Sequence, residues 1–185
     1  GAAATLLETA SPPEMINIIE TYKATICFTS PTAYRVMLNA MDEGADLSSL
    51  RIAVSAGETL PAPVFNDWQA KTGKTMLDGI GATEMLHIFM SNRIDDARPA
   101  CTGKPITGYQ AKVVDEQMQE MARGEVGKLA VRGPTGCRYL NDARQTNYVV
   151  DGWNLTGDAF YQDEEGYFHF AARTDDMILS SGYNI

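Results

Sequence analysis

The sequence predicts an α/β fold: a parallel sheet built from βα repeats with flanking helices, followed by a small antiparallel β-barrel or meander. Two observations lead to this prediction. In the first half, short apolar runs alternate with segments whose apolar residues recur at helical spacing. In the second half, short β-rich runs are separated by single glycines. The α/β part is assigned to residues 1–104 and the small β part to residues 105–172.

The first half opens with an apolar run at residues 2–7 that suits a strand, and a helix is predicted directly after it. Ser11-Pro12-Pro13-Glu14 has the form of a capping box with proline at the first helical position. The apolar residues that follow have helical spacing, which places them on one face of this helix: Met15, Ile18, Ile19 and Tyr22.

Two further βα units follow in the first half. A β-rich run at residues 24–28 precedes a helix that begins after Ser30-Pro31 and has Gly44 as its stop signal. A strand at residues 51–55 precedes a helix at residues 61–72 that ends at Gly73. A strand at residues 74–80 follows. The expected buried faces of the two helices are Ala33, Val36, Met37, Ala40 and Met41 in the first, and Val64, Phe65 and Trp68 in the second.

Glycines punctuate the second half of the chain. Short strands are predicted at residues 110–115, 126–132, 153–156, 160–162 and 167–171. The last of these lacks a period-2 alternation of apolar and polar residues, so both of its faces are expected to be covered. A Gly/Pro-rich stretch at residues 102–108 predicts the boundary between the two parts.

The composition argues against several classes of partner. The net charge of −9 argues against nucleic acid, because phosphate binding requires clustered Lys and Arg. No apolar run approaches the roughly 20 residues that a membrane-spanning helix needs, so no membrane partner is expected. The start, Gly1 to Thr5, lacks a basic n-region and an initiator Met, which fits a piece of a longer chain. The cysteines Cys27, Cys101 and Cys137 form no metal or disulfide pattern, which predicts a reducing cytoplasm.

The first chemical motif is Asp78-Gly79-Ile80-Gly81-Ala82-Thr83-Glu84-Met85, at the carboxyl end of a predicted parallel strand. Ligands of open α/β sheets lie beyond the carboxyl ends of the strands. Gly79 and Gly81 are expected to let a ligand approach the backbone. Thr83 could donate to a phosphate oxygen, and Glu84 offers the hard oxygen that Mg²⁺ prefers. The motif alone fits a strand-to-loop turn with a solvated acid equally well.

Two later motifs carry charged side chains that could bind a nucleotide. In Gly152-Trp153-Asn154-Leu155-Thr156-Gly157-Asp158, the carboxylate could accept two hydrogen bonds from the vicinal diol of a ribose. The alternative is an Asp that closes a tight turn. In Arg173-Thr174-Asp175-Asp176, the guanidinium could donate to ribose or phosphate oxygens, and Asp175 could be a pivot for a following domain. An exposed turn with a salt bridge explains this second motif as well.

The order of the motifs resembles the acyl- and aryl-CoA synthetases of the adenylate-forming superfamily. The residues that carry the resemblance are Ser55-Ala56-Gly57-Glu58, Gly81-Ala82-Thr83-Glu84, Gly152-Trp153 with Thr156-Gly157-Asp158, and Arg173-Thr174-Asp175-Asp176. They span essentially the whole chain. Within the superfamily, the Asp78-to-Phe89 segment is most similar to benzoate and aminobenzoate CoA ligases. Many other members have Tyr where this chain has Ile80.

The resemblance implies a role for each matching position. Ala56, Gly57 and Glu58 would flank the adenine. Asp78, Gly79 and Ile80 would line the adenine and acid sites. Thr83 and Glu84 are the implied catalytic pair: Thr83 would contact the phosphate and Glu84 would bind Mg²⁺. Asp158 would hold the ribose hydroxyls with Arg173 beside it, and Asp175 would be the hinge. Ile80, Gly81 and His87 would border the aromatic ring of the acid. His87, on an apolar strand expected at Leu86-His87-Ile88-Phe89, could instead be a satisfied core residue.

The resemblance also implies an activity with ATP/AMP, Mg²⁺ and coenzyme A as cofactors. An aromatic carboxylic acid would form an acyl-adenylate, and CoA would then displace AMP. Residues 173–185 would hold the hinge and the start of a C-terminal domain of the same parent chain. A homodimer is a further option. The family's phosphate loop and C-terminal lysine are not found among these residues, so the isolated chain is expected to be inactive. The alternatives are an adenylation domain that loads a carrier protein and a non-catalytic nucleotide-binding module.

Overall fold

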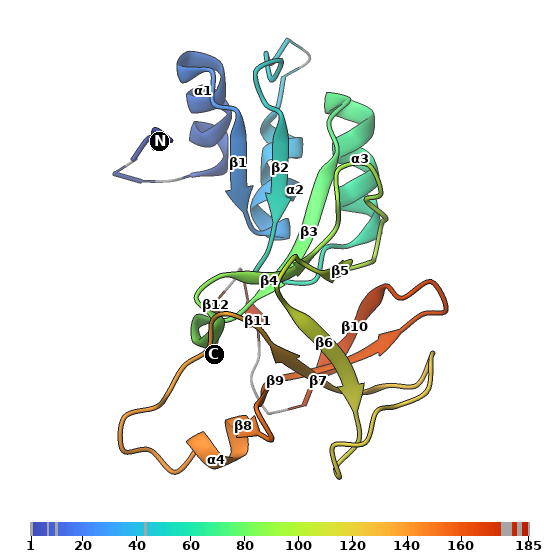
Figure 1. Ribbon diagram of the computed structural model, residues 1–185. Helices are drawn as coiled ribbons and strands as arrows, with labels where there is room; N and C mark the ends of the chain where they lie inside the picture. Colours follow the sequence, from blue (N-terminus) through green and yellow to red (C-terminus); the bar gives the residue numbers. More distant parts are fainter. Residues whose placement is uncertain are drawn as a thin grey trace.

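The fold contains two five-stranded sheets, and residues of both line one cleft. The computed structural model describes residues 2–6, 8–9, 11–42, 44–174, 179–180 and 183–184. In Figure 1 the parallel strands and their helices occupy the upper part of the molecule, and the antiparallel sheet lies below them. The predicted fold class, a βα-repeat parallel sheet followed by a small antiparallel unit, is confirmed.

The first sheet has the strand order β1-β2-β3-β4-β5. Its parallel strands are β1 (Ile26–Thr29), β2 (Ile52–Ser55) and β3 (Met76–Gly81). The sheet then continues with β4 (Ile88–Ser91), which overlaps the apolar strand expected at residues 86–89, and with β5 (Lys104–Pro105), which was not predicted. Both strands pair antiparallel. β3 is therefore the strand at which the pairing changes from parallel to antiparallel.

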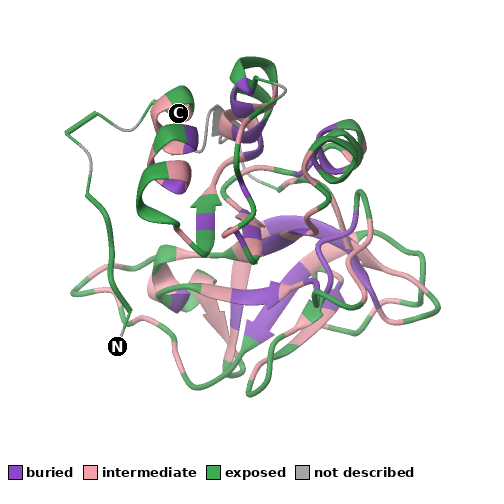
Figure 2. Ribbon diagram, turned by 90° about the horizontal axis from the view of Figure 1, so that it is seen from above, coloured by how far each residue is buried: buried purple, intermediate pink, exposed green. Residues whose placement is uncertain are grey.

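Helices α1 (Pro12–Tyr22), α2 (Pro31–Ala40) and α3 (Ala62–Thr72) connect these strands. The predicted caps are present: the Ser11 Oγ accepts from the Glu14 N–H at 3.4 Å, and the Ser30 Oγ accepts from the Ala33 N–H at 3.3 Å. Gly73 ends α3 in the left-handed region, with φ of 66°. Figure 2, seen from above, shows the three helices in a row on one side of the molecule.

One face of the parallel sheet packs against these helices, and the other face is partly open. Tyr34 and Trp68 are fully buried under the sheet with their rings edge-on, 4.8 Å between centroids. The Tyr34 hydroxyl lies 2.8 Å from the Cys27 carbonyl oxygen, to which it donates. On the opposite face, Ile26 and Phe28 of β1 are 51% and 50% exposed. The covered face therefore carries the core of this half.

The second sheet is antiparallel and has the order β10-β9-β7-β6. The strands are β6 (Gln110–Val114), β7 (Gly127–Arg132), β9 (Trp153–Gln162) and β10 (Phe168–Arg173). The short helix α4 (Gln145–Tyr148) and strand β8 (Val149–Val150) lie between β7 and β9 in the sequence, and β8 pairs with β9. Strands β11 (Leu179–Ser180) and β12 (Tyr183–Asn184) pair with each other.

Three predictions about individual elements are wrong. The strands predicted at residues 153–156 and 160–162 form one strand, β9, because Gly157, with φ of 79°, allows a bend where the register with β7 shifts. No strand forms at residues 2–6, because this run has no partner strand and Leu6 is 92% exposed. The buried face of α1 is also shifted, with Ile16 inside and Tyr22 64% exposed.

The two sheets share a second core. Met85, Phe89 and Met90 from the end of the first sheet pack with side chains of the second: Val113, Leu129, Val131, Phe160 and Phe168. Backbone bonds between Thr102 or Gly103 and Phe168 link the segment before β5 to β10. The division at residue 104 stays a prediction. Within the part of the chain that the structure describes, no helix has the length and apolar character needed to cross a bilayer.

Candidate functional site

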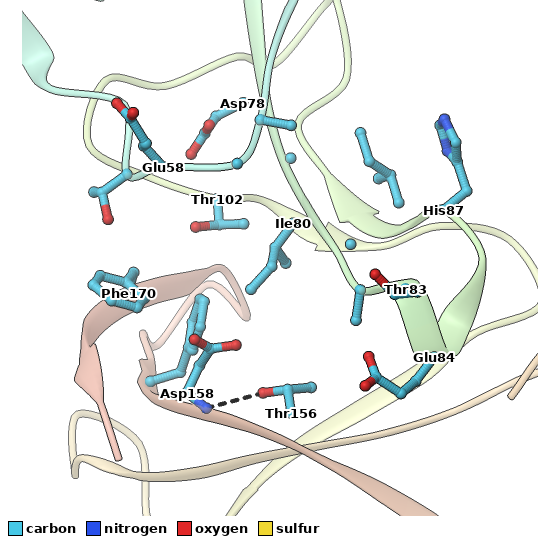
Figure 3. Close-up of a pocket in the computed structure, with 18 of the residues that line it drawn as sticks. Glu58, Asp78, Ile80, Thr83, Glu84, His87, Thr102, Thr156, Asp158 and Phe170 are labelled. Atoms are coloured by element: carbon cyan, nitrogen blue, oxygen red, sulfur yellow. Dashed lines mark hydrogen bonds between the residues drawn. The ribbon is translucent and has the colours of Figure 1, made fainter. Parts of the chain in front are cut away.

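A cleft of about 510 Å³ opens where the parallel strands end and the second sheet begins. This is the position at which open α/β sheets bind ligands. Figure 3 shows side chains from both sheets pointing into it. Every predicted site residue that the structure describes lines this cleft: Ala56, Gly57, Glu58, Asp78, Gly79, Ile80, Gly81, Thr83, Glu84, His87, Asp158 and Arg173. Asp175, the predicted hinge, lies outside the described residues.

The glycines of β3 allow the returning chain to pack closely against this strand. A Cβ built on Gly81 would lie 2.5 Å from the carbonyl oxygen of His87, and one on Gly79 would lie 3.0 Å from the Ile88 Cδ1. These contacts belong to the chain that returns as β4. Both glycines also line the cleft, and their predicted role in the approach of a ligand stays a prediction.

Asp78 is a buried and strongly perturbed carboxyl group of the cleft. It is 5% exposed, and its Oδ1 has no hydrogen-bond partner within the described ranges. Burial raises the pKa of Asp78 to about 8, with a hydrogen bond from the Gly79 N–H acting in the opposite direction. The Ser55 Oγ and Glu58 Oε1 are also buried without a partner there, whereas the Glu58 Oε2 accepts from the Thr32 hydroxyl at 2.8 Å. This end of the cleft therefore suits a ligand that offers hydrogen-bond donors.

Asp158 and Arg173 face each other across neighbouring strands. The register pairs them directly, and the Arg173 Nη1 donates to the Asp158 Oδ1 at 2.8 Å. Their side chains are only 9% and 19% exposed, so this is a largely desolvated ion pair. The Asp158 N–H donates to the Thr156 Oγ1 at 3.2 Å, which fixes the strand at this point. The guanidinium therefore orients the carboxylate on the cleft wall.

Thr83 and Glu84 lie on a 3₁₀ turn (Thr83–Met85) that joins β3 to β4. Thr83 is exposed on the cleft wall. The Glu84 Oε1 accepts a hydrogen bond of 2.7 Å from the hydroxyl of Tyr139. Figure 3 shows Glu84 and Asp158 at the same cleft, with Thr156 between them. The two acids, which are far apart in the sequence, therefore meet at one cavity, as the sequence analysis expected.

Tyr139 was not among the site residues predicted from the sequence. It lies in the loop between β7 and β8, at residues 133–148, where nothing in the residue spacing connects it to the turn at Glu84. Only the folded chain brings the two residues, which are 55 positions apart, into contact. An aromatic residue in a Gly-containing loop carries no chemical signature of its own.

His87 borders an apolar end of the cleft. It is exposed and precedes β4, so the alternative interpretation of His87 as a core residue is wrong. Its ring lies 5.9 Å from that of Phe28, and Ile80 and Ile88 line the same cleft. These side chains form a wall that fits a flat apolar ring.

Glu84 is the residue that fits a divalent cation. In the described ranges no cluster of three or more His, Cys, Asp or Glu side chains could hold a metal by itself. Mg²⁺ requires no such cluster, because it is commonly bound by one or two carboxylates together with water and substrate phosphates. One carboxylate oxygen that faces an open cleft agrees with that mode of binding.

Comparisons with known proteins identify many relatives. The chain is 39% identical to a benzoate–CoA ligase of Thauera aromatica, with 98% of this chain and 36% of that protein aligned. It is 36% identical to an anthranilate–CoA ligase of Pseudomonas aeruginosa, with 98% of this chain and 35% of that protein aligned. The chain thus spans little more than a third of the length of these relatives.

The structural comparisons agree. The crystal structure of the anthranilate CoA ligase AuaEII in complex with anthranoyl-AMP matches with a TM-score of 0.90 and 37% identity, over 100% of this chain and 37% of that one. A benzoate CoA ligase from Burkholderia xenovorans matches with a TM-score of 0.83 and 33% identity, over 92% of this chain and 36% of that one. The family model for AMP-binding enzymes matches residues 1–139. The chain belongs to the AMP-binding enzyme family.

Proposed function

We propose that the full-length protein containing this chain is an ATP-dependent aryl-CoA ligase. An aromatic carboxylate attacks the α-phosphate of ATP, which forms an acyl-adenylate and releases pyrophosphate. The thiolate of CoA then attacks the acyl carbon and releases AMP. The observation that carries this proposal is the single cleft in which Asp78, Glu84 and Asp158 converge, in a chain that aligns over 98% of its length with a benzoate–CoA ligase.

The adenine and ribose are assigned to the part of the cleft around Asp78 and Asp158. The buried acceptors of Asp78 and Glu58 match the exocyclic amine of adenine, which donates hydrogen bonds. The carboxylate of Asp158, oriented by Arg173, accepts from the two ribose hydroxyls. Ala56, Gly57 and Gly79 line the cleft between these groups and flank the base.

The phosphates are assigned to the turn at Thr83. Its hydroxyl donates to an oxygen of the α-phosphate, and Glu84 holds Mg²⁺ together with phosphate oxygens and water. Bound Mg²⁺ supplies neutralisation of the phosphate charge, which lets the anionic acid approach. No general base is required, because the attacking carboxylate is already ionised at neutral pH.

The acid is assigned to the apolar wall formed by Phe28, Ile80 and His87, with Gly81 beside them. The names of the relatives favour benzoate or anthranilate. They also favour CoA over a carrier protein as the acceptor. The hinge at Asp175, a C-terminal domain of the same chain as partner, a homodimer and a cytoplasmic location stay predictions.

The test is acid-dependent turnover by the full-length protein. ATP, Mg²⁺ and CoA are supplied with benzoate or 2-aminobenzoate. The release of AMP and the formation of the thioester are then measured. The proposal expects both products to depend on the aromatic acid. Adenylate formation without transfer to CoA would favour the carrier-loading alternative. Nucleotide binding without acid-dependent AMP release would favour the non-catalytic module and contradict the proposal.

A further inference from the structure

The turn that carries Glu84 is held from behind by the loop at residues 133–148. The Thr135 hydroxyl donates to the Met85 carbonyl oxygen at 2.8 Å. Tyr109 donates in turn to the Thr135 oxygen, because the Thr135 proton is already engaged. Further along the loop, the Tyr139 hydroxyl donates to the Glu84 Oε1. This loop, which follows β7 of the second sheet, therefore contacts both the backbone of the turn and the carboxylate of Glu84.

Tyr139 is itself held in place by three contacts within the loop. Its N–H donates to the Gln145 Oε1 at 2.7 Å. Its ring packs edge-on against Tyr148, with 5.6 Å between centroids, and the Arg144 guanidinium lies 5.2 Å from its centre. A side chain fixed in this way can fix the group to which it donates.

The hydrogen bond from Tyr139 occupies one of the two oxygens of the Glu84 carboxylate. The Tyr139 hydroxyl donates to Oε1 of this carboxylate at 2.7 Å. No described residue donates to its Oε2, and Glu84 lines the cleft.

We propose that Tyr139 is a positioning residue for metal binding: by holding the Glu84 Oε1, it aims the Oε2 of the same carboxylate at the cation that accompanies ATP. This inference rests on the proposed function, because it requires Glu84 to be a Mg²⁺ ligand. Hydrogen-bonded partners of metal-binding carboxylates orient the ligand, and their removal typically costs about 10- to 100-fold in metal affinity or activity. Without Tyr139, Glu84 can adopt rotamers that point away from the cleft.

Tyr148 provides a matched control. It lies in the same cluster, with its ring against that of Tyr139, and its buried hydroxyl has no hydrogen-bond partner among the residues that the structure describes. Tyr148→Phe and Tyr139→Phe therefore remove the same atom from neighbouring rings. Only the second removes a bond to Glu84.

The experiment measures ATP binding to the full-length protein by calorimetry, first in EDTA and then with increasing Mg²⁺. Binding of Mn²⁺ with ATP, followed by electron paramagnetic resonance, gives a readout that does not depend on turnover. Tyr139→Phe should raise the cation concentration at half-saturation about 10-fold or more. The same variant should leave the affinity for metal-free ATP and the thermal midpoint close to wild type. Tyr148→Phe should match wild type in all of these measurements.

An unchanged cation requirement in Tyr139→Phe would overturn the inference. So would an equal loss of ATP affinity with and without the cation, because that is the result of a merely structural role. Glu84→Gln separates this failure from a failure of the proposed function. If Glu84→Gln also leaves the cation requirement unchanged, then the assignment of Mg²⁺ to Glu84 is wrong and the inference fails with it. If Glu84→Gln alone changes it, only the role of Tyr139 is refuted.

Discussion

The two sheets contribute carboxylates of opposite character to the same cleft. On the parallel side, Asp78 is buried with an oxygen that has no partner within the described chain. Asp158, on the second sheet, is paired with Arg173, and Glu84, on the turn between β3 and β4, accepts from Tyr139 of a loop of the second sheet. The first kind of carboxylate gains a partner only when a ligand donates to it. The second kind is already oriented before any ligand arrives.

This difference separates two physical tasks. A buried polar group without a partner costs free energy in the empty protein, on the order of 1–3 kcal/mol, and a ligand that donates to it offsets this cost. Such a group discriminates strongly between ligands with and without a donor. A pre-oriented carboxylate loses little entropy on binding and serves to place charge. Under the proposed function, the cleft would combine selection for the base, by Asp78, with positioning of ribose and phosphate by carboxylates that residues of the second sheet and its loop orient.

The largest effect is expected from Asp158→Ala in the full-length protein. This change removes the proposed ribose acceptor and leaves the largely buried Arg173 without the Asp158 carboxylate. Breaking a buried pair should lower the free energy of unfolding by about 3 kcal/mol, and ATP affinity should fall about 100-fold. Denaturant titration and calorimetry measure the two effects.

The exposed pair Arg93–Asp95 supplies the control, because its side chains are 81% and 69% exposed. Asp95→Ala should change stability by less than about 1 kcal/mol. Unchanged ATP affinity in Asp158→Ala would remove this residue from the ribose role.

The next largest effect is expected from Gly81→Ala. The new Cβ would lie 2.5 Å from a backbone oxygen of His87, so the junction of β3 and β4 must shift. Overpacking of this kind should lower the free energy of unfolding by about 2 kcal/mol. Gly44→Ala is the control, because a Cβ there meets nothing within 4 Å. Equal stability of the two variants in a denaturant titration would show that β4 can yield without cost.

A smaller effect is expected from the pH dependence of Asp78. Its folded pKa of about 8 lies above the usual value for an Asp, so the native state binds a proton that the unfolded chain has released. The contribution of this group to stability is therefore complete below pH 4 and is lost as the pH rises from about 4 to 8. Wild type should therefore lose stability relative to Asp78→Asn across this interval. Parallel stability curves for the two proteins, from denaturant titrations at each pH, would contradict this.

The sequence predicted the elements that depend on local patterns. The caps at Ser11 and Ser30 and the stop at Gly73 were predicted correctly, because each depends on a few adjacent residues. The continuation of the first sheet into β5 was not predicted, since a two-residue strand exists only through its partner. For the same reason the run at residues 2–6 was wrongly assigned as a strand.

The candidate site divides in the same way. Asp78, Glu84 and Asp158 were found because each lies in a short motif whose order along the chain resembles a known family. Arg173 was expected beside Asp158 for the same reason, although their direct pairing depends on a strand register. The contact of Tyr139 with Glu84 was not predicted, because it depends on the path of a long loop. Residues that act on other residues leave little trace in the spacing of a single sequence.

The smallest effect on stability is expected on the open face of the parallel sheet. Ile26 and Phe28 are half exposed on the same face of β1, but only Phe28 lines the cleft. In the full-length protein, Phe28→Ala should raise the KM for benzoate about 5- to 10-fold, since about half of a Phe transfer energy is lost from the acid wall. Ile26→Ala should leave that KM unchanged, and neither variant should lose more than about 1 kcal/mol of stability. A loss of several kcal/mol in Ile26→Ala would instead show that further residues of the full-length protein cover this face, which would remove the contrast between an open and a closed sheet.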